Sequence, residues 1–157
     1  MSRNSNSIVL SVKTRWCDLI LSGRKTIEIR RGCWPENEWR IIWGGSLAAG
    51  NLAPLDEEEI SRRVYIYRTG KNGAIVGEFE CGLESDCFVA SKICSVPKEA
   101  CMTQDEFLAY IGDRENVLCI CINRLKVYDE PRTLADVGLK RAPQSWCYAR
   151  KEVSHDA

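Results

Sequence analysis

Three charged side chains, Lys25, Glu28 and Arg30, lie close together in the segment SGRKTIEIRR at residues 22–31. A lysine can act as a general base when burial or neighbouring cations lower its pKa, whereas a nearby carboxylate raises that pKa. Side chains two positions apart in a strand share a face, so Glu28 and Arg30 can pair with each other or flank a ligand. The same pattern also fits a solvated strand face with a surface ion pair, which adds little to stability.

A second group of polar and aromatic side chains lies in the segment PQSWCY at residues 143–148. Gln144 offers an amide donor and acceptor, and Ser145 offers a hydroxyl. Trp146 and Tyr148 offer flat rings, so the group is suited to reading and stacking a flipped-out base. The alternative is that Trp146 and Tyr148 are alternate strand residues that close the core, with Gln144 in a turn.

Other catalytic and metal-binding patterns do not fit the sequence. A Ser-His-Asp triad is excluded because the only histidine is His155, and no glycine-rich phosphate loop occurs. The nine cysteines contain no Cys-x-x-Cys pair, and their odd number argues against a disulfide framework. We therefore expect reduced, mostly buried cysteines that pack as small hydrophobic side chains, with no metal site and no cofactor.

The elements that would position the first group are a strand, a helix and a second strand, at residues 7–13, 14–23 and 25–31. Thr14 is placed to cap the helix, and Gly23 is placed to end it. The second strand alternates, so Ile27 and Ile29 would face the core while the charged positions between and after them face away.

The rest of the chain predicts further short elements. Strand patterns occur at residues 39–43, 63–68, 74–82 and 116–128, and Asn72-Gly73 predicts a tight hairpin turn. Helical patterns occur at residues 56–63, 103–112 and 133–138, the second with Thr103 and Glu106 as a capping box. Residues 84–102 give no clear pattern. Together these signals predict an α+β fold with two or three short helices, whose sheet curls into a small mixed β-barrel.

The length of 157 residues fits one domain, placed at residues 8–150 with an inserted loop at 39–59. We expect a flexible arm at 1–7 and a flexible tail at 151–157. The chain has no net charge, but residues 1–40 hold eight Lys/Arg and four Asp/Glu, so a local basic site is compatible with the neutral whole. The sequence has no apolar run long enough to span a membrane and no signal-peptide pattern, so we expect a cytoplasmic protein.

Four blocks of the sequence resemble, in order, the ASCH domain family of PUA-like β-barrels, and most of all its small stand-alone bacterial and prophage members. The blocks are LSVKTRWCDLILSGRKTIEIRR, YIYRTGKNGAIVGEFECG, DEFLAYIG and VYDEPRTLADVGLKRAPQSWCYAR. The signature Gly-x-Lys-x-x-Glu-x-Arg of that family is matched by Gly23, Lys25, Glu28 and Arg30.

The resemblance implies an electropositive cleft beside the first helix that binds RNA, single-stranded nucleic acid or a nucleotide-like ligand. The residues expected to contact the ligand are Lys13, Arg24, Lys25, Glu28, Arg30, Gln144, Ser145, Trp146 and Tyr148. The cations would meet phosphate or a base edge, Glu28 would accept from an exocyclic amine or hold Arg30, and the 144–146 segment would close on the base.

Two alternatives stay open. One branch of the family hydrolyses N4-acylated cytidines with a lysine, a threonine and a glutamate, and other members are credited with RNA cleavage. Lys25 matches that lysine, but Glu28 stands where the threonine would be, so a hydrolase would use Lys25 and Glu28 as its catalytic pair. The chain could instead be a protein-interaction module if Trp34, Trp39 and Trp43 form an exposed apolar patch. The sequence leaves the oligomeric state open.

Overall fold

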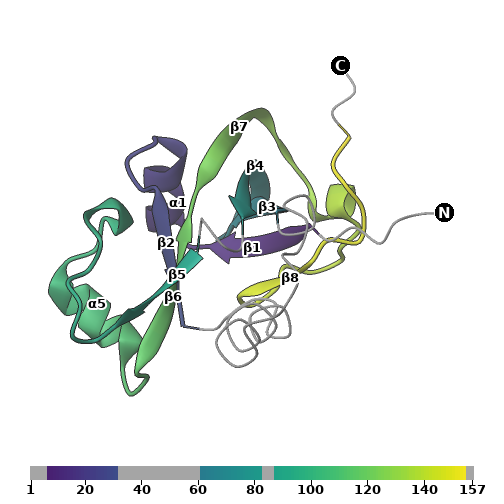
Figure 1. The fold of residues 1–157 in the computed structure, drawn as a ribbon. Helices are drawn as coiled ribbons and strands as arrows, with labels where there is room; N and C mark the ends of the chain where they lie inside the picture. The colour runs from purple at the N-terminus through teal and green to yellow at the C-terminus, as the bar shows by residue number, and fades with distance from the viewer. Residues whose placement is uncertain (1–6, 32–60, 83–86, 155–157) are drawn as a thin grey trace, which may run out of the picture.

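Two β-sheets and two α-helices make up the part of the chain that the computed structural model describes, residues 7–31, 61–82 and 87–154 (Figure 1). The strands are β1 (Ile8–Val12), β2 (Ile27–Arg30), β3 (Ser61–Arg68), β4 (Ala74–Gly82), β5 (Cys87–Ser91), β6 (Asn116–Cys121), β7 (Asn123–Arg132) and β8 (Trp146–Tyr148). The helices are α1 (Thr14–Leu21) and α5 (Gln104–Ile111), with two 3-10 turns, η2 (Lys98–Ala100) and η3 (Leu134–Val137). The predicted strand at 39–43, the inserted loop, residues 56–60 of the helical pattern and all three tryptophans of the expected apolar patch lie outside the described residues. Residues 61–63 of the helical pattern belong to β3, so the predicted helix is wrong there.

The strands form a five-stranded sheet in the order β7-β4-β3-β1-β8 and a three-stranded sheet in the order β2-β6-β5. β1 and β3 are parallel, and the other strand pairs are antiparallel. The predicted α+β fold is confirmed, but these residues form no closed barrel. The chain passes from one sheet to the other between β6 and β7: β6 pairs with β2 and β5, whereas β7 pairs with β4.

The first three elements have the predicted order, and burial explains where each one lies. All five residues of β1 are buried, and Cys17 and Ile20 of α1 share one core cluster with three of them, Ile8, Leu10 and Val12. The chain leaves α1 through Gly23, whose φ of +81° favours glycine. The prediction that Thr14 caps α1 is wrong. Lys13 is the N-cap residue, and Thr14 is the first helical residue, whose hydroxyl donates to the Thr69 carbonyl at 3.1 Å.

Local sequence signals identified most of the later elements. The hairpin of β3 and β4 is confirmed, as is the capping box that starts α5 at Thr103. The single strand predicted at 116–128 is wrong, because the chain breaks at Ile122 into β6 and β7. β5 had no clear pattern in the sequence: Phe88 and Val89 are exposed in succession, so its burial does not alternate.

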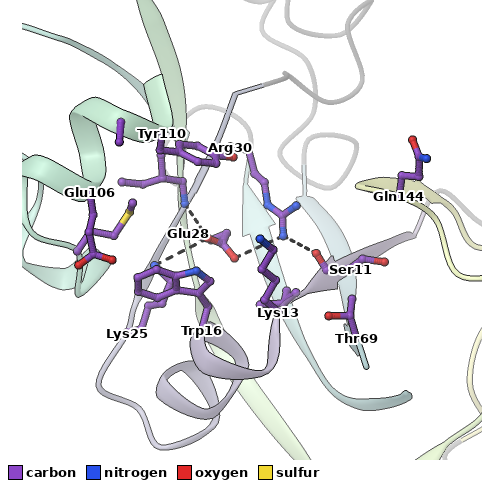
Figure 2. A pocket seen from close by; sticks show the side chains of 14 residues that line it. Ser11, Lys13, Trp16, Lys25, Glu28, Arg30, Thr69, Glu106, Tyr110 and Gln144 are labelled. Carbon is purple, nitrogen blue, oxygen red and sulfur yellow. Dashed lines mark hydrogen bonds and ion pairs between the residues drawn. The ribbon is translucent and has the colours of Figure 1, made fainter. Parts of the chain in front are cut away.

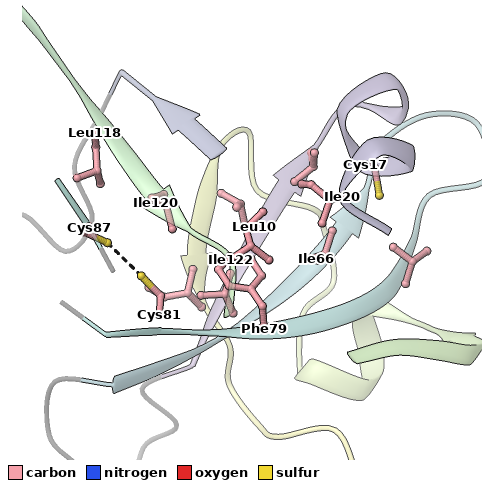
Figure 3. Close-up of a cluster of buried hydrophobic side chains, with 14 residues drawn as sticks. Leu10, Cys17, Ile20, Ile66, Phe79, Cys81, Cys87, Leu118, Ile120 and Ile122 are labelled. Carbon is pink, nitrogen blue, oxygen red and sulfur yellow. Dashed lines mark hydrogen bonds between the residues drawn. The ribbon is translucent and has the colours of Figure 1, made fainter. Parts of the chain in front are cut away.

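The largest core cluster lies between the two sheets and α1 (Figure 3). A second cluster holds Ile27 and Ile29 of β2 against Phe107 and Ile111 of α5, so the two isoleucines face the core as predicted.

The eight described cysteines are thiols, four of them buried. No helix in the described ranges is long and apolar enough to span a membrane. The domain boundaries stay predictions, although the 150–153 segment packs on the domain and Val153 is 4% exposed.

Candidate functional site

A cavity of about 480 Å³ opens where the end of β1, the start of α1, β2 and α5 meet (Figure 2). Its walls therefore come from both sheets and both helices. The residues that line it are Ser11, Val12, Lys13, Trp16, Lys25, Glu28, Ile29, Arg30, Thr69, Met102, Glu106, Ala109, Tyr110 and Gln144. We call this cavity the cleft.

The Lys25 ammonium group lies inside the cleft wall, with only 1% of the residue exposed. The backbone places it there, because the Lys25 amide donates to the Leu19 carbonyl at the end of α1. Its Nζ donates to the Ala100 carbonyl of η2 at 2.6 Å and lies 4.8 Å from the centre of the Trp16 ring. Burial lowers the pKa of Lys25, and the nearby Glu28 carboxylate opposes that shift.

The Glu28 carboxylate lies between two cations, with 6% of the residue exposed. Its Oε1 is 3.8 Å from the Lys25 Nζ and accepts from the Ile29 amide at 3.0 Å. Its Oε2 is 3.5 Å from a terminal nitrogen of Arg30. The carboxylate is thus neutralised from both sides, by two cations that each also donate to a backbone carbonyl at 2.6 Å.

Arg30 also ties β2 to β1 and to the segment before β8. Its guanidinium donates to the Ser11 carbonyl at 2.6 Å and to the Ser145 hydroxyl at 3.4 Å. Ser11 holds the same segment, because its hydroxyl donates to the Pro143 carbonyl at 2.7 Å and its amide to the Ser145 carbonyl at 2.9 Å. These contacts place Gln144 on the rim of the cleft, where its amide is exposed.

Lys13 is the cation with the most freedom in the cleft. It follows β1 directly, its side chain is exposed at the rim, and no ion pair ties it to another residue in the described ranges. Lys13 is drawn with the other lining side chains in the close-up of the cleft (Figure 2). Beside it lies the Trp16 ring, which is partly buried and forms one wall.

The cleft brings together five of the nine residues that the sequence analysis singled out: Lys13, Lys25, Glu28, Arg30 and Gln144. Arg24 is exposed and does not line it, although it precedes Lys25 directly. Ser145 contacts Arg30 from outside the lining. Trp146 packs against the main core cluster, which agrees with the core-closing alternative for that ring. Tyr148 meets the Trp146 ring edge-on at 5.4 Å but is 42% exposed, so it does not close the core.

Sequence reasoning missed the wall that α5 contributes. Glu106 lines the cleft and pairs with Arg15 of α1 at 3.0 Å, while the Arg15 guanidinium lies 4.3 Å from the centre of the Trp16 ring. Tyr110 lines the cleft too, and its hydroxyl accepts from the Arg31 amide. The capping-box pattern found Glu106 as a helix start, but no local signal places α5 beside β2. That placement comes from the core cluster they share.

The comparisons with known proteins identify the fold. The sequence matches no protein-family model and no curated protein. Among solved structures, the chain is similar to the ASCH protein of Zymomonas mobilis, with a TM-score of 0.65 and 18% identity over 93% of this chain and 89% of that one. Two point mutants of that protein give TM-scores of 0.64 and 0.66, at 18% and 16% identity, over 93% and 96% of this chain and 91% and 92% of theirs. The chain therefore has an ASCH-type fold.

Proposed function

We propose that this chain, with its ASCH-type fold, binds single-stranded RNA or a nucleotide-like ligand in the cleft beside α1. The observation that carries the proposal is the charge arrangement of the cleft. Glu28 is neutralised by Lys25 and Arg30, and Glu106 by Arg15, so that Lys13 is left as a cation at the rim. A cleft with a surplus of positive charge and an aromatic wall suits a phosphate joined to a base.

The geometry supports separate roles for the lining residues. Lys13 meets a phosphate, because its ammonium group is exposed and can reach different positions. Trp16 offers a ring against which a base can stack, and Gln144 offers an amide that can hydrogen-bond to a base edge. Lys25 and Arg30 act mainly as positioning residues, since they hold the Glu28 carboxylate that faces the ligand.

The test is a titration of fluorescently labelled single-stranded RNA with the wild type and with Lys13→Ala, over a range of salt concentrations. We expect Lys13→Ala to weaken binding and to reduce the salt slope by about one, because one phosphate contact is lost. Lys92→Ala is the matched control, because Lys92 is exposed and does not line the cleft. Equal affinity of Lys13→Ala and the wild type, or no binding by either, contradicts the proposal.

A hydrolase is the second candidate, and the burial of Lys25 is the observation that favours it. A lysine whose pKa is lowered by burial can lose its proton more easily and accept one from an attacking water, with Glu28 as its partner. The substrates to test are N4-acetylcytidine and single-stranded RNA. Turnover by the wild type supports a hydrolase if Lys25→Met and Glu28→Gln both abolish it while each variant still unfolds cooperatively. Absence of turnover above these two variants contradicts it.

A further inference from the structure

The sulfur atoms of Cys81 and Cys87 lie 3.0 Å apart in the core between the two sheets (Figure 3). Cys81 belongs to β4 of the five-stranded sheet and Cys87 to β5 of the three-stranded sheet. Both are thiols, and their residues are 0% and 3% exposed. A disulfide bond has a sulfur–sulfur length of about 2.05 Å, so the two sulfur atoms need to move only about 1 Å closer to form one.

From this contact we infer that Cys81 and Cys87 are a site of oxidative modification, where a disulfide forms between the two sheets. The two residues are six positions apart in sequence, so little chain entropy opposes their meeting. The surrounding apolar side chains, among them Leu118 and Ile120, hold both sulfur atoms in the same core cluster. Their proximity gives each thiol a far higher effective concentration toward the other than toward a thiol in solution.

The reaction needs an oxidant, and a small dialkyl disulfide such as oxidised glutathione supplies it. The thiolate of one cysteine attacks a sulfur of that disulfide, which forms a mixed disulfide and releases one small thiolate. The thiolate of the second cysteine then attacks the protein-bound sulfur and releases the other. Each cysteine proton ends on a released small thiol. The two cysteines together lose two electrons, and the oxidant gains them.

The position of the bond sets its effect on the molecule. β1 and β2 form facing parts of the cleft and belong to the two sheets that the bond would join. The disulfide therefore adds a covalent cross-link between sheets that are otherwise held by packing in the shared core and by the hydrogen bond from Arg30 to the Ser11 carbonyl. It restricts the unfolded chain as well, which raises the stability of the oxidised protein over the reduced one.

The test is a redox titration of the full chain with defined ratios of oxidised to reduced glutathione, in a sub-denaturing concentration of urea that gives the oxidant access to the core. The remaining thiols are then alkylated, and the cross-links are located by peptide mapping. We expect the link between Cys81 and Cys87 to form at a lower ratio than any other link. We also expect the oxidised wild type to melt about 5 °C higher than the reduced protein.

Cys94→Ser is the matched control, because Cys94 is exposed and outside the core clusters. It should keep both the cross-link and the higher melting temperature, whereas Cys87→Ser should lose both. The inference is overturned if Cys81 and Cys87 still take up the alkylating agent after Cys94 has been oxidised, or if they cross-link first to other cysteines. Peptide mapping of the wild type decides between these results even if Cys87→Ser does not fold.

Discussion

Lys25 and Glu28 form an ion pair that is almost wholly removed from solvent, and that burial governs what each residue can do. The Lys25 Nζ is also bound to the Ala100 carbonyl, which lies 75 positions away in sequence. Removing Lys25 leaves the buried Glu28 carboxylate with Arg30 as its remaining cationic partner. Breaking a buried ion pair typically destabilises a protein by about 3–5 kcal/mol. Loss of ligand binding in a Lys25 variant would therefore be ambiguous, so Lys13 is the better position for testing the cleft.

The burial of Lys25 predicts a pH dependence of stability. Because the folded-state pKa lies below 10.5, the unfolded chain binds this proton more tightly than the folded chain. The penalty of burying the charge is full at low pH, and it is relieved as the pH rises through the folded-state pKa toward 10.5.

Denaturant unfolding of the wild type and Lys25→Met from about pH 8 to about pH 10 measures this effect. The unfolding free energy of the wild type should rise relative to Lys25→Met, by at most about 1.4 kcal/mol per pH unit. Arg24→Met is the control, because Arg24 is the exposed neighbour, and its difference from the wild type should not change with pH. A constant difference for Lys25→Met as well would contradict the burial of a charged Lys25.

The sequence predicted part of this site for a physical reason. Glu28 and Arg30 are brought to one face by strand alternation, which is a local property that spacing reveals. The direction of Lys25 was not predictable in the same way, because it lies in the turn between Gly23 and β2. There Arg24 is exposed and Lys25 is buried, and the burial depends on η2 and Trp16 rather than on neighbouring residues.

At the scale of elements, patterns formed by a few neighbouring residues predicted structure well. Features that depend on pairing with residues distant in sequence were not predicted. The capping box of α5 is a local pattern, and the structure contains both of its hydrogen bonds. The break at Ile122 is not local, because β6 and β7 separate only where they pair with different sheets. The contribution of α5 to the cleft was not predicted for the same reason, because α5 and β2 are distant in sequence and meet only through the core cluster they share.

The two threonines that the sequence marked as helix caps give a matched pair of variants. Thr103→Ala should destabilise the protein by about 1 kcal/mol, because the Thr103 hydroxyl accepts from the Glu106 amide. Thr14→Ala should have a smaller effect, because the Thr14 side chain does not cap α1. Thermal or denaturant unfolding of both variants measures the difference. An equal or larger loss for Thr14→Ala would contradict this ranking, since the Thr14 hydroxyl makes an exposed hydrogen bond to the Thr69 carbonyl and no capping bond.

At the scale of the whole molecule, a polar network fastens the C-terminal segment to the five-stranded sheet. The Tyr65 hydroxyl donates to Glu152 and accepts from the Val153 amide. Arg63 bridges Glu152 to Glu78, which in turn accepts from the Tyr128 hydroxyl at 2.8 Å. The network lies beside the third core cluster, which includes Val153.

Tyr65→Phe should destabilise the protein by about 1–2 kcal/mol near neutral pH, because it removes a buried hydroxyl with two partners. Burial, and then the hydrogen bond to Glu152, raise the pKa of Tyr65 to about 12 from 10.0. The stability that the hydroxyl adds is complete below pH 10.0 and is lost as the pH rises toward about 12. Unfolding of both proteins from about pH 9 to about pH 11 should show the gap between them narrowing. An unchanged gap would contradict the network.

The chain as a whole has no net charge, but the side chains that line the cleft carry more positive than negative charges. Lys13 is exposed at the rim, while both carboxylates of the cleft are paired with cations. Binding in this cleft is the central claim, and an amide and indole N–H chemical-shift titration of the ¹⁵N-labelled protein with a short single-stranded RNA tests it most directly. We predict shifts at the Trp16 indole and at the amides of Lys13 and Arg30, and weaker shifts in Lys13→Ala. Shifts confined to residues outside the cleft, or no shifts at saturating RNA, would contradict the claim.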